Sequence, residues 1–255
     1  MLNYIRSELY RNFHQKGSYL LIGVCGGLLV AMHVLLGVVE AQAQGSFNYG
    51  NLSFTFTMLL GAGPLLVAVA LVAGSVAFGE EYKNGTMKNT VAYGFSRVKI
   101  FFGKQIAALI TAMICFLAII AIFLVSGLIF LQNASAAEYQ ELLTGMIAII
   151  PNLMGVLALT VSLHLIMESG AGAQWIGLGI VFVLPPVFEL LGIKFPIFAE
   201  LLNWIPSQAI GNVMTETGYV WDTAEGMLHC VSVGAIWLAF SLGFGCIGFA
   251  RKEIK

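Results

Sequence analysis

The stretch that decides the fold is residues 105–137, QIAALITAMICFLAIIAIFLVSGLIFLQNASAA, which hold no Asp, Glu, Lys or Arg over 33 positions. A helix needs about 20 predominantly apolar residues to cross a bilayer, so this stretch predicts a membrane-spanning helix. Five further charge-free stretches are as long as one span, at residues 17–39, 41–79, 142–167, 169–188 and 226–250. The first third of residues 41–79 is polar and turn-rich, so we expect one span there, beginning near Ser53. The sequence therefore predicts six spans.

The composition excludes a soluble globular protein. Of the 255 residues, 59% are apolar and 10% are charged, whereas about 25% are charged in an average soluble domain. The net charge of -1 gives no reason to expect a nucleic-acid partner. The four cysteines lie singly in apolar runs, which favours packing over a metal or disulfide role. We expect a single all-α polytopic membrane domain over residues 1–255, with spans at about residues 18–39, 53–78, 105–131, 145–167, 172–191 and 227–249.

The basic residues predict the orientation of these spans, because Lys and Arg are enriched in cytoplasmic segments. Eleven of the twelve fall on one side if there are six spans with both termini in the cytoplasm, and Lys194 is the exception. The opposite loops carry mostly Glu and Asp. We therefore expect a multi-pass protein of the bacterial inner (cytoplasmic) membrane with both termini cytoplasmic.

Two segments outside the spans have a distinctive pattern. Residues 1–16 predict an amphipathic helix at the cytoplasmic interface, because their apolar side chains fall on one helical face, namely Leu2, Ile5, Leu9 and Phe13. Residues 189–225 are apolar but broken by prolines before the sixth span. They predict a hairpin that re-enters the membrane, for which the backbone must be shielded by protein. An interfacial loop anchored by Trp204 and Trp221 is the alternative, and the sequence does not decide between the two.

The common catalytic, metal-binding and phosphate-binding motifs are absent from the sequence. There is no His-Glu-x-x-His, Gly-x-Ser-x-Gly or Cys-x-x-Cys, and the four histidines are scattered over different segments. A phosphate-binding loop is also missing, because Gly103-Lys104 lacks the upstream glycine and the following hydroxyl residue. We therefore expect no catalytic site, no metal and no cofactor in this chain, and we rank an intramembrane enzyme last. If ATP drives the protein, another chain must bind it.

The most informative segment is FGEEYKNGTMK at residues 78–88, followed by GFSRVKI at residues 94–100 and by Lys104. This segment resembles the first cytoplasmic loop of an ABC-2 type transporter permease. In that family the second span leads into a Glu-rich turn, then Gly-Thr and a Lys, then a Ser-Arg pair and a Lys at the opening of the third span. Each of these elements is present here in the same order. The six spans and the Pro-broken segment before the sixth extend the resemblance over the whole chain.

The resemblance implies a six-span subunit that works with a separate ATP-binding cassette ATPase, which binds ATP and Mg. It also implies a dimer with a second copy or with a homologous permease in the lipid bilayer. The loop would then carry the ATPase contact, and the residues implied for this coupling are Glu80, Glu81, Lys83, Asn84, Gly85, Thr86, Lys88, Arg97 and Lys104, with Glu168 as a minor second contact.

The pattern within the loop agrees with that role. Gly85 breaks the turn and Thr86 can cap a helix, which predicts an amphipathic coupling helix over residues 86–97 between the second and third spans. Anchoring of this helix to anionic lipid is the alternative. The adjacent Glu80 and Glu81 would be repelled by such lipid, which favours docking to a protein.

The expected function is export of an amphipathic or hydrophobic substrate such as a peptide antibiotic, a toxin, a drug or a lipid. The reason is that the span faces offer aromatic, Met and hydroxyl groups but almost no charge. The competing hypothesis is an ATP-independent secondary carrier or a membrane sensor. A cation-coupled carrier normally has acidic residues at mid-membrane, and the predicted spans have none there.

Overall fold

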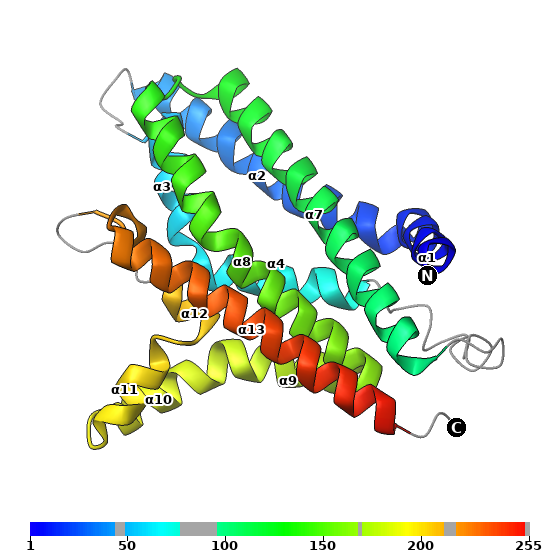
Figure 1. The fold of residues 1–255 in the computed structure, drawn as a ribbon. Coiled ribbons are helices and arrows are strands. Elements are labelled where there is room, and N and C mark those ends of the chain that lie inside the picture. The colour runs from blue at the N-terminus through cyan, green and yellow to red at the C-terminus, as the bar shows by residue number, and fades with distance from the viewer. Residues whose placement is uncertain (44–48, 77–95, 168–169, 212–217, 253–255) are drawn as a thin grey trace.

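The computed structural model describes residues 1–43, 49–76, 96–167, 170–211 and 218–252, and within these ranges it contains helices and no strand (Figure 1). The longer helices are α1 (Leu2–His14), α2 (Lys16–Ala43), α3 (Leu52–Gly61), α4 (Gly63–Val76), α7 (Arg97–Phe130), α8 (Ala136–Ile166), α9 (Gly170–Leu178), α10 (Leu184–Gly192) and α13 (Ala224–Arg251). The shorter ones are the π-helix η1 (Gly179–Val183), α11 (Pro196–Leu202), α12 (Pro206–Ala209) and the 3-10 helix η2 (Val220–Asp222). The prediction of an all-α polytopic membrane protein is confirmed.

Five helical segments are long and apolar enough to cross a membrane, namely Lys16–Ala43, Arg97–Phe130, Ala136–Ile166, Gly170–Gly192 and Ala224–Arg251. The bent pair α3 and α4 makes up to six if it counts as one span. Helices α7 and α8 begin well before the predicted spans, which start at about residues 105 and 145. A helix continues past its apolar core until a cap ends it, and at α8 the cap is Ser135, which forms a capping box with Glu138.

The second span is not the straight helix that its apolar composition suggests. Helices α3 and α4 meet at Ala62 with a bend of 68°. The physical cause is Pro64, which has no N–H to donate to the carbonyl four residues earlier and which disfavours helical backbone at Gly63. On one side the bend is covered by α12, since a Cβ at Gly63 would lie 2.7 Å from the carbonyl oxygen of Ile210.

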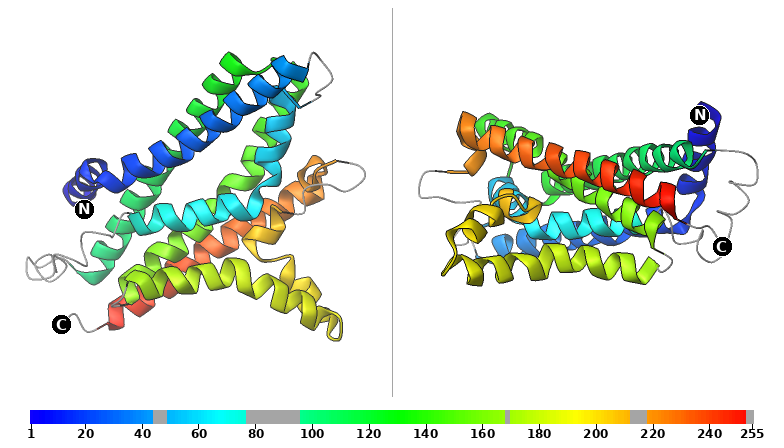
Figure 2. Two further views of the ribbon diagram at one scale, coloured as in Figure 1. Left: turned by 180° about the vertical axis from the view of Figure 1, so that it is seen from behind. Right: turned by 60° about the horizontal axis from the view of Figure 1, so that its bottom comes forward.

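Helix α8 is the centre of the bundle, and every residue from Gly155 to Leu165 in its second half is buried inside the protein. Helix α13 runs parallel to it along most of its length, and α2 runs parallel to α7 (Figures 1 and 2). Close approach of α8 and α13 needs glycine, because a Cβ at Gly234 would lie 2.4 Å from the carbonyl carbon of Pro151. A helix this apolar on every face is expected where neighbours surround it.

The segment between η1 and α13 has a packed part and an exposed part, and Trp221, one of the two expected interfacial anchors, is buried in the core instead. Helix α12 and its flanks are packed in protein against α4, α8 and α13, with Ser207 and Ile210 buried. In contrast, the hairpin formed by α10 and α11 leaves Ile193 and Ile197 exposed at the far end from the two termini (Figure 1). Shielding of the kind that a re-entrant piece requires is therefore present at α12, whereas the hairpin has an exposed apolar surface.

Candidate functional site

The described Lys and Arg residues other than Lys194 gather at one end of the bundle, where α1, the start of α7 and the ends of α8 and α13 lie (Figures 1 and 2). We call this the charged end; it comprises residues 1–16, 96–104, 165–167 and 250–252. Most of the predicted coupling residues fall outside the described ranges, namely Glu80, Glu81, Lys83, Asn84, Gly85, Thr86, Lys88 and Glu168. Of the predicted set, Arg97 and Lys104 are described, and both take part in contacts at the charged end.

Arg97 is the first residue of α7 and joins that helix to α13. Its guanidinium donates to the carbonyl oxygen of Ala250 at 3.0 Å and also to that of Lys252. These carbonyls close the last turn of α13, where a cation also interacts favourably with the helix dipole. We expected Arg97 at the end of the loop helix, and the structure instead puts it in the first turn of the third span helix.

Lys252 extends the connection to α8. Its ammonium group donates to the carbonyl oxygens of Leu165 at 3.1 Å and Met167 at 3.0 Å, at the C-terminal end of α8. The same residue accepts from Arg97 through its backbone carbonyl. The ends of α7, α13 and α8 are therefore joined through two consecutive contacts, a role that the sequence did not indicate for Lys252.

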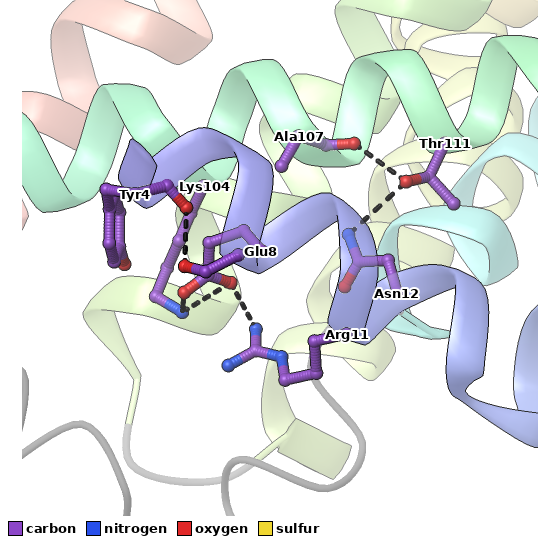
Figure 3. A network of polar contacts seen from close by, with 8 residues as sticks. Tyr4, Glu8, Arg11, Asn12, Lys104, Ala107 and Thr111 are labelled. Atoms are coloured by element: carbon purple, nitrogen blue, oxygen red, sulfur yellow. Dashed lines mark hydrogen bonds and ion pairs between the residues drawn. The ribbon is translucent and has the colours of Figure 1, made fainter. Parts of the chain in front are cut away.

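Lys104 is paired with an acidic residue of α1. Its ammonium nitrogen lies 3.3 Å from both carboxylate oxygens of Glu8, and Arg11 donates to the same carboxylate (Figure 3). Lys104 is only 2% exposed and Glu8 only 6%. Removing one partner of such a buried pair leaves a charge without compensation, which is strongly unfavourable. The side chain of Lys104 is thus covered by α1 and is not on the surface that a partner protein can contact.

Helix α1 docks through its polar stripe. Tyr4, Glu8 and Asn12 recur every four residues and face α7, where Asn12 donates to the hydroxyl of Thr111 at 3.4 Å (Figure 3). The ring of Tyr4 lies directly over Gly103, so close that a Cβ at that position would come within 2.5 Å of the ring. Leu2 on the other side is 79% exposed. The sequence offered one signal for this site, since Glu8 is the single acidic residue among residues 1–16.

An apolar cavity of about 390 Å³ lies beyond this network, between α2, α3, α4, α7 and α8. Its lining is aliphatic, aromatic and thioether, apart from Cys25 and Thr55. The hydroxyl of Thr55 already donates to the carbonyl oxygen of Leu52 at 2.9 Å. A second, polar cavity of about 400 Å³ lies near the α11–α12 segment, where His229 contacts the carbonyl oxygen of Asn203. Among the described residues there is no group of three His, Cys, Asp or Glu side chains that could hold a metal ion.

The comparison with protein families gives one match. The model of a family described as ABC-2 family transporter protein matches residues 15–253. The matched range contains every described helix from α2 to α13 and leaves out α1. No curated protein matches the chain.

Proposed function

This chain belongs to the ABC-2 family of transporter proteins, and we propose that it is the permease subunit of an ATP-driven exporter in the bacterial cytoplasmic membrane. Its partners are an ATP-binding cassette ATPase, which holds ATP and Mg, and a second copy of itself or a homologous permease. Both termini and the charged end lie on the cytoplasmic side. This orientation rests on the distribution of basic residues.

The observation that carries the proposal is the set of contacts at the charged end. Residues 77–96 lie between α4 and α7 in the sequence. A force applied to this loop therefore reaches α7 at Arg97, then α13 through the contact of Arg97 with Ala250 and Lys252, and α8 through Lys252. Chains of packed and hydrogen-bonded groups of this kind can carry energetic coupling between two sites.

The coupling residues then fall into two groups. Glu80, Glu81 and the residues that follow them to Lys88 contact the ATPase, because carboxylates at a helix head pair with basic groups or with free N–H groups. Arg97 and Lys104 act as positioning residues, since their side chains are directed at α13 and α1. Glu168 follows the carbonyl of Met167 that Lys252 contacts, and it provides a minor second contact.

The substrate is an amphipathic or hydrophobic molecule such as a peptide antibiotic, a toxin, a drug or a lipid. The support for this class is the scarcity of charge within the spans and the apolar lining of the cavity between α2, α3, α4, α7 and α8. Sites for such ligands are lined mainly by apolar side chains with few polar groups.

The test is ATP-dependent transport by the chain reconstituted with the ATPase that co-purifies from its native membrane. The pure chain should hydrolyse no ATP, and the complex should move a hydrophobic substrate into inverted vesicles when ATP is supplied. Glu81→Gln should lower transport while the complex stays assembled, and Glu225→Gln at the other end of the bundle should leave transport unchanged. ATP-independent uptake by the pure chain would reject the proposal in favour of a secondary carrier.

A further inference from the structure

The apolar cavity between α2, α3, α4, α7 and α8 lies within a single chain. Its volume of about 390 Å³ falls in the range of small-ligand sites, roughly 300 to 1,000 Å³. This volume is sufficient for a hydrocarbon chain.

The lining selects the chemistry of the occupant. Its two residues with polar atoms are Cys25 and Thr55, and the Thr55 hydroxyl is already bonded to the carbonyl oxygen of Leu52. A ligand with a polar group inside the cavity would lose its bonds to water without replacement, which is unfavourable. An empty cavity of this size is also costly, because its lining atoms lack dispersion partners. The stable occupant is therefore apolar, as the hydrocarbon chains of the surrounding membrane are.

Five of the ten methionines of the chain line this cavity, namely Met32, Met58, Met113, Met146 and Met154. Methionine is unbranched and polarisable, so it adapts to ligands of irregular shape. A lining this rich in Met favours chains of various lengths over a single rigid ligand.

The mouth of the cavity is on the surface that faces lipid when the helices span a bilayer. Leu28, Leu65 and Leu117 line the cavity and are 68%, 64% and 58% exposed, respectively. They come from α2, α4 and α7. A hydrocarbon chain can thus enter sideways from the membrane without crossing a polar surface.

We propose that this cavity is a binding site for one aliphatic chain, supplied by a membrane lipid or by a single-chain amphiphile. The bound aliphatic chain lies against Ala62, which lines the cavity at the bend between α3 and α4. It occupies the space between α4 and the α2–α7 pair. This inference deepens the substrate class proposed above, which rests in part on the same cavity, but binding itself requires neither the ATPase nor ATP and is tested without transport.

The test uses the pure chain in lipid nanodiscs and two photoactivatable probes, a palmitic acid with a diazirine near the end of its chain and a phosphatidylcholine carrying the same chain. Peptide mass spectrometry should find adducts from at least one probe on the residues around Met113 and Met154, saturating at one per chain. Adducts from the free acid identify a single-chain amphiphile as a source, and adducts from the phospholipid identify a bilayer lipid. The proposal would be overturned if, with both probes, adducts on the cavity residues were no more frequent than adducts on the exposed Ile129.

A cavity-filling variant provides the matched control. Leu29→Trp fills part of the cavity from α2, so the bound hydrocarbon chain can bury fewer of its methylene groups. The loss of only two of them should weaken labelling about tenfold. Leu35→Trp makes the same change at an exposed position of α2 outside the lining and should leave labelling unchanged. Competition gives a readout without mutation, since unlabelled laurate should suppress the adducts and butyrate should not. Equal labelling of both variants, or no effect of laurate, would contradict the site whatever the outcome of the transport assay.

Discussion

The α8–α13 interface and the α1–α7 interface are both held by buried polar groups, but the groups differ in kind. Between α8 and α13 they are neutral and donate to backbone carbonyls: Asn152 donates to Cys230 at 2.9 Å and Ser162 to Ser241 at 2.8 Å. Between α1 and α7 the main contact is the ion pair of Glu8 and Lys104.

This difference teaches which parts of the molecule can separate. The α8–α13 bonds lie within the span helices, where water cannot replace a lost partner. Helix α1 lies at the charged end, so Glu8 and Lys104 can be hydrated if it detaches. We infer that α8 and α13 move as one unit and that α1 is the element whose docking on α7 can be broken.

The largest effect is expected at the α8–α13 contact. Gly234→Ala places a Cβ 2.4 Å from the backbone of Pro151, which cannot move aside as a side chain would. Such overpacking should destabilise the protein by about 3 kcal/mol, measured as a lower unfolding temperature and a lower folded yield. Gly243→Ala on the same helix has nothing within 4 Å of its Cβ and should behave as the unchanged protein. Equal unfolding temperatures for the two variants would show that the helices are free to shift.

The next effect tests the separable interface. Lys104→Met leaves Glu8 buried without its main partner. The free energy that holds α1 on α7 should fall by about 1–3 kcal/mol, while the span helices stay folded. Hydrogen exchange of the α1 amides should then be about 5- to 150-fold faster, with little change in α8.

Two controls define that result. Lys99→Met removes an exposed lysine from the same helix and should not alter exchange in α1. Glu8→Gln added to Lys104→Met removes the buried carboxylate charge that has lost Lys104 and should restore part of the protection. If Lys104→Met melts α8 together with α1, the two interfaces are not independent.

A smaller effect is expected at the connection between them. Arg97→Gln removes the donor to the carbonyls of Ala250 and Lys252, a loss of about 1 kcal/mol for these partly exposed bonds. Exchange should rise in the last turn of α13 and not in α1. Arg251→Gln, at an exposed position of the same turn, is the comparison variant. An increase that spreads to α1 would mean that Arg97 also supports the docking of that helix.

The smallest effect is expected at Thr111. The bond from Asn12 to its hydroxyl is long, at 3.4 Å, and the hydroxyl also donates to Ala107 within α7. Thr111→Val should therefore cost about 0.5 kcal/mol, the low end of the net contribution of a hydrogen bond, and Thr111→Ser should cost less because it keeps the hydroxyl. A loss in Thr111→Val as large as that in Lys104→Met would show that the amide contact, and not the ion pair, fixes α1.

Much of the fold follows from the sequence, since bilayer thickness fixes the length of an apolar run that can span. The helical, multi-span architecture and the family follow from the charge-free stretches and from the loop motif at residues 78–104. The bend at Ala62 was overlooked, although Pro64 in the middle of residues 53–78 is a local signal for it.

What the sequence determined by itself is thus the helical, multi-span architecture, the charge of each end and the membership of the ABC-2 family, because these depend on local composition and on order along the chain. Only the tertiary structure decided that Lys104 pairs with Glu8, 96 positions away, and that Arg97 contacts Lys252, 155 positions away. The physical reason is that the span helices are apolar on nearly every face. No periodic stripe then specifies which helices pack together, and the partners of the few charged side chains follow from that packing.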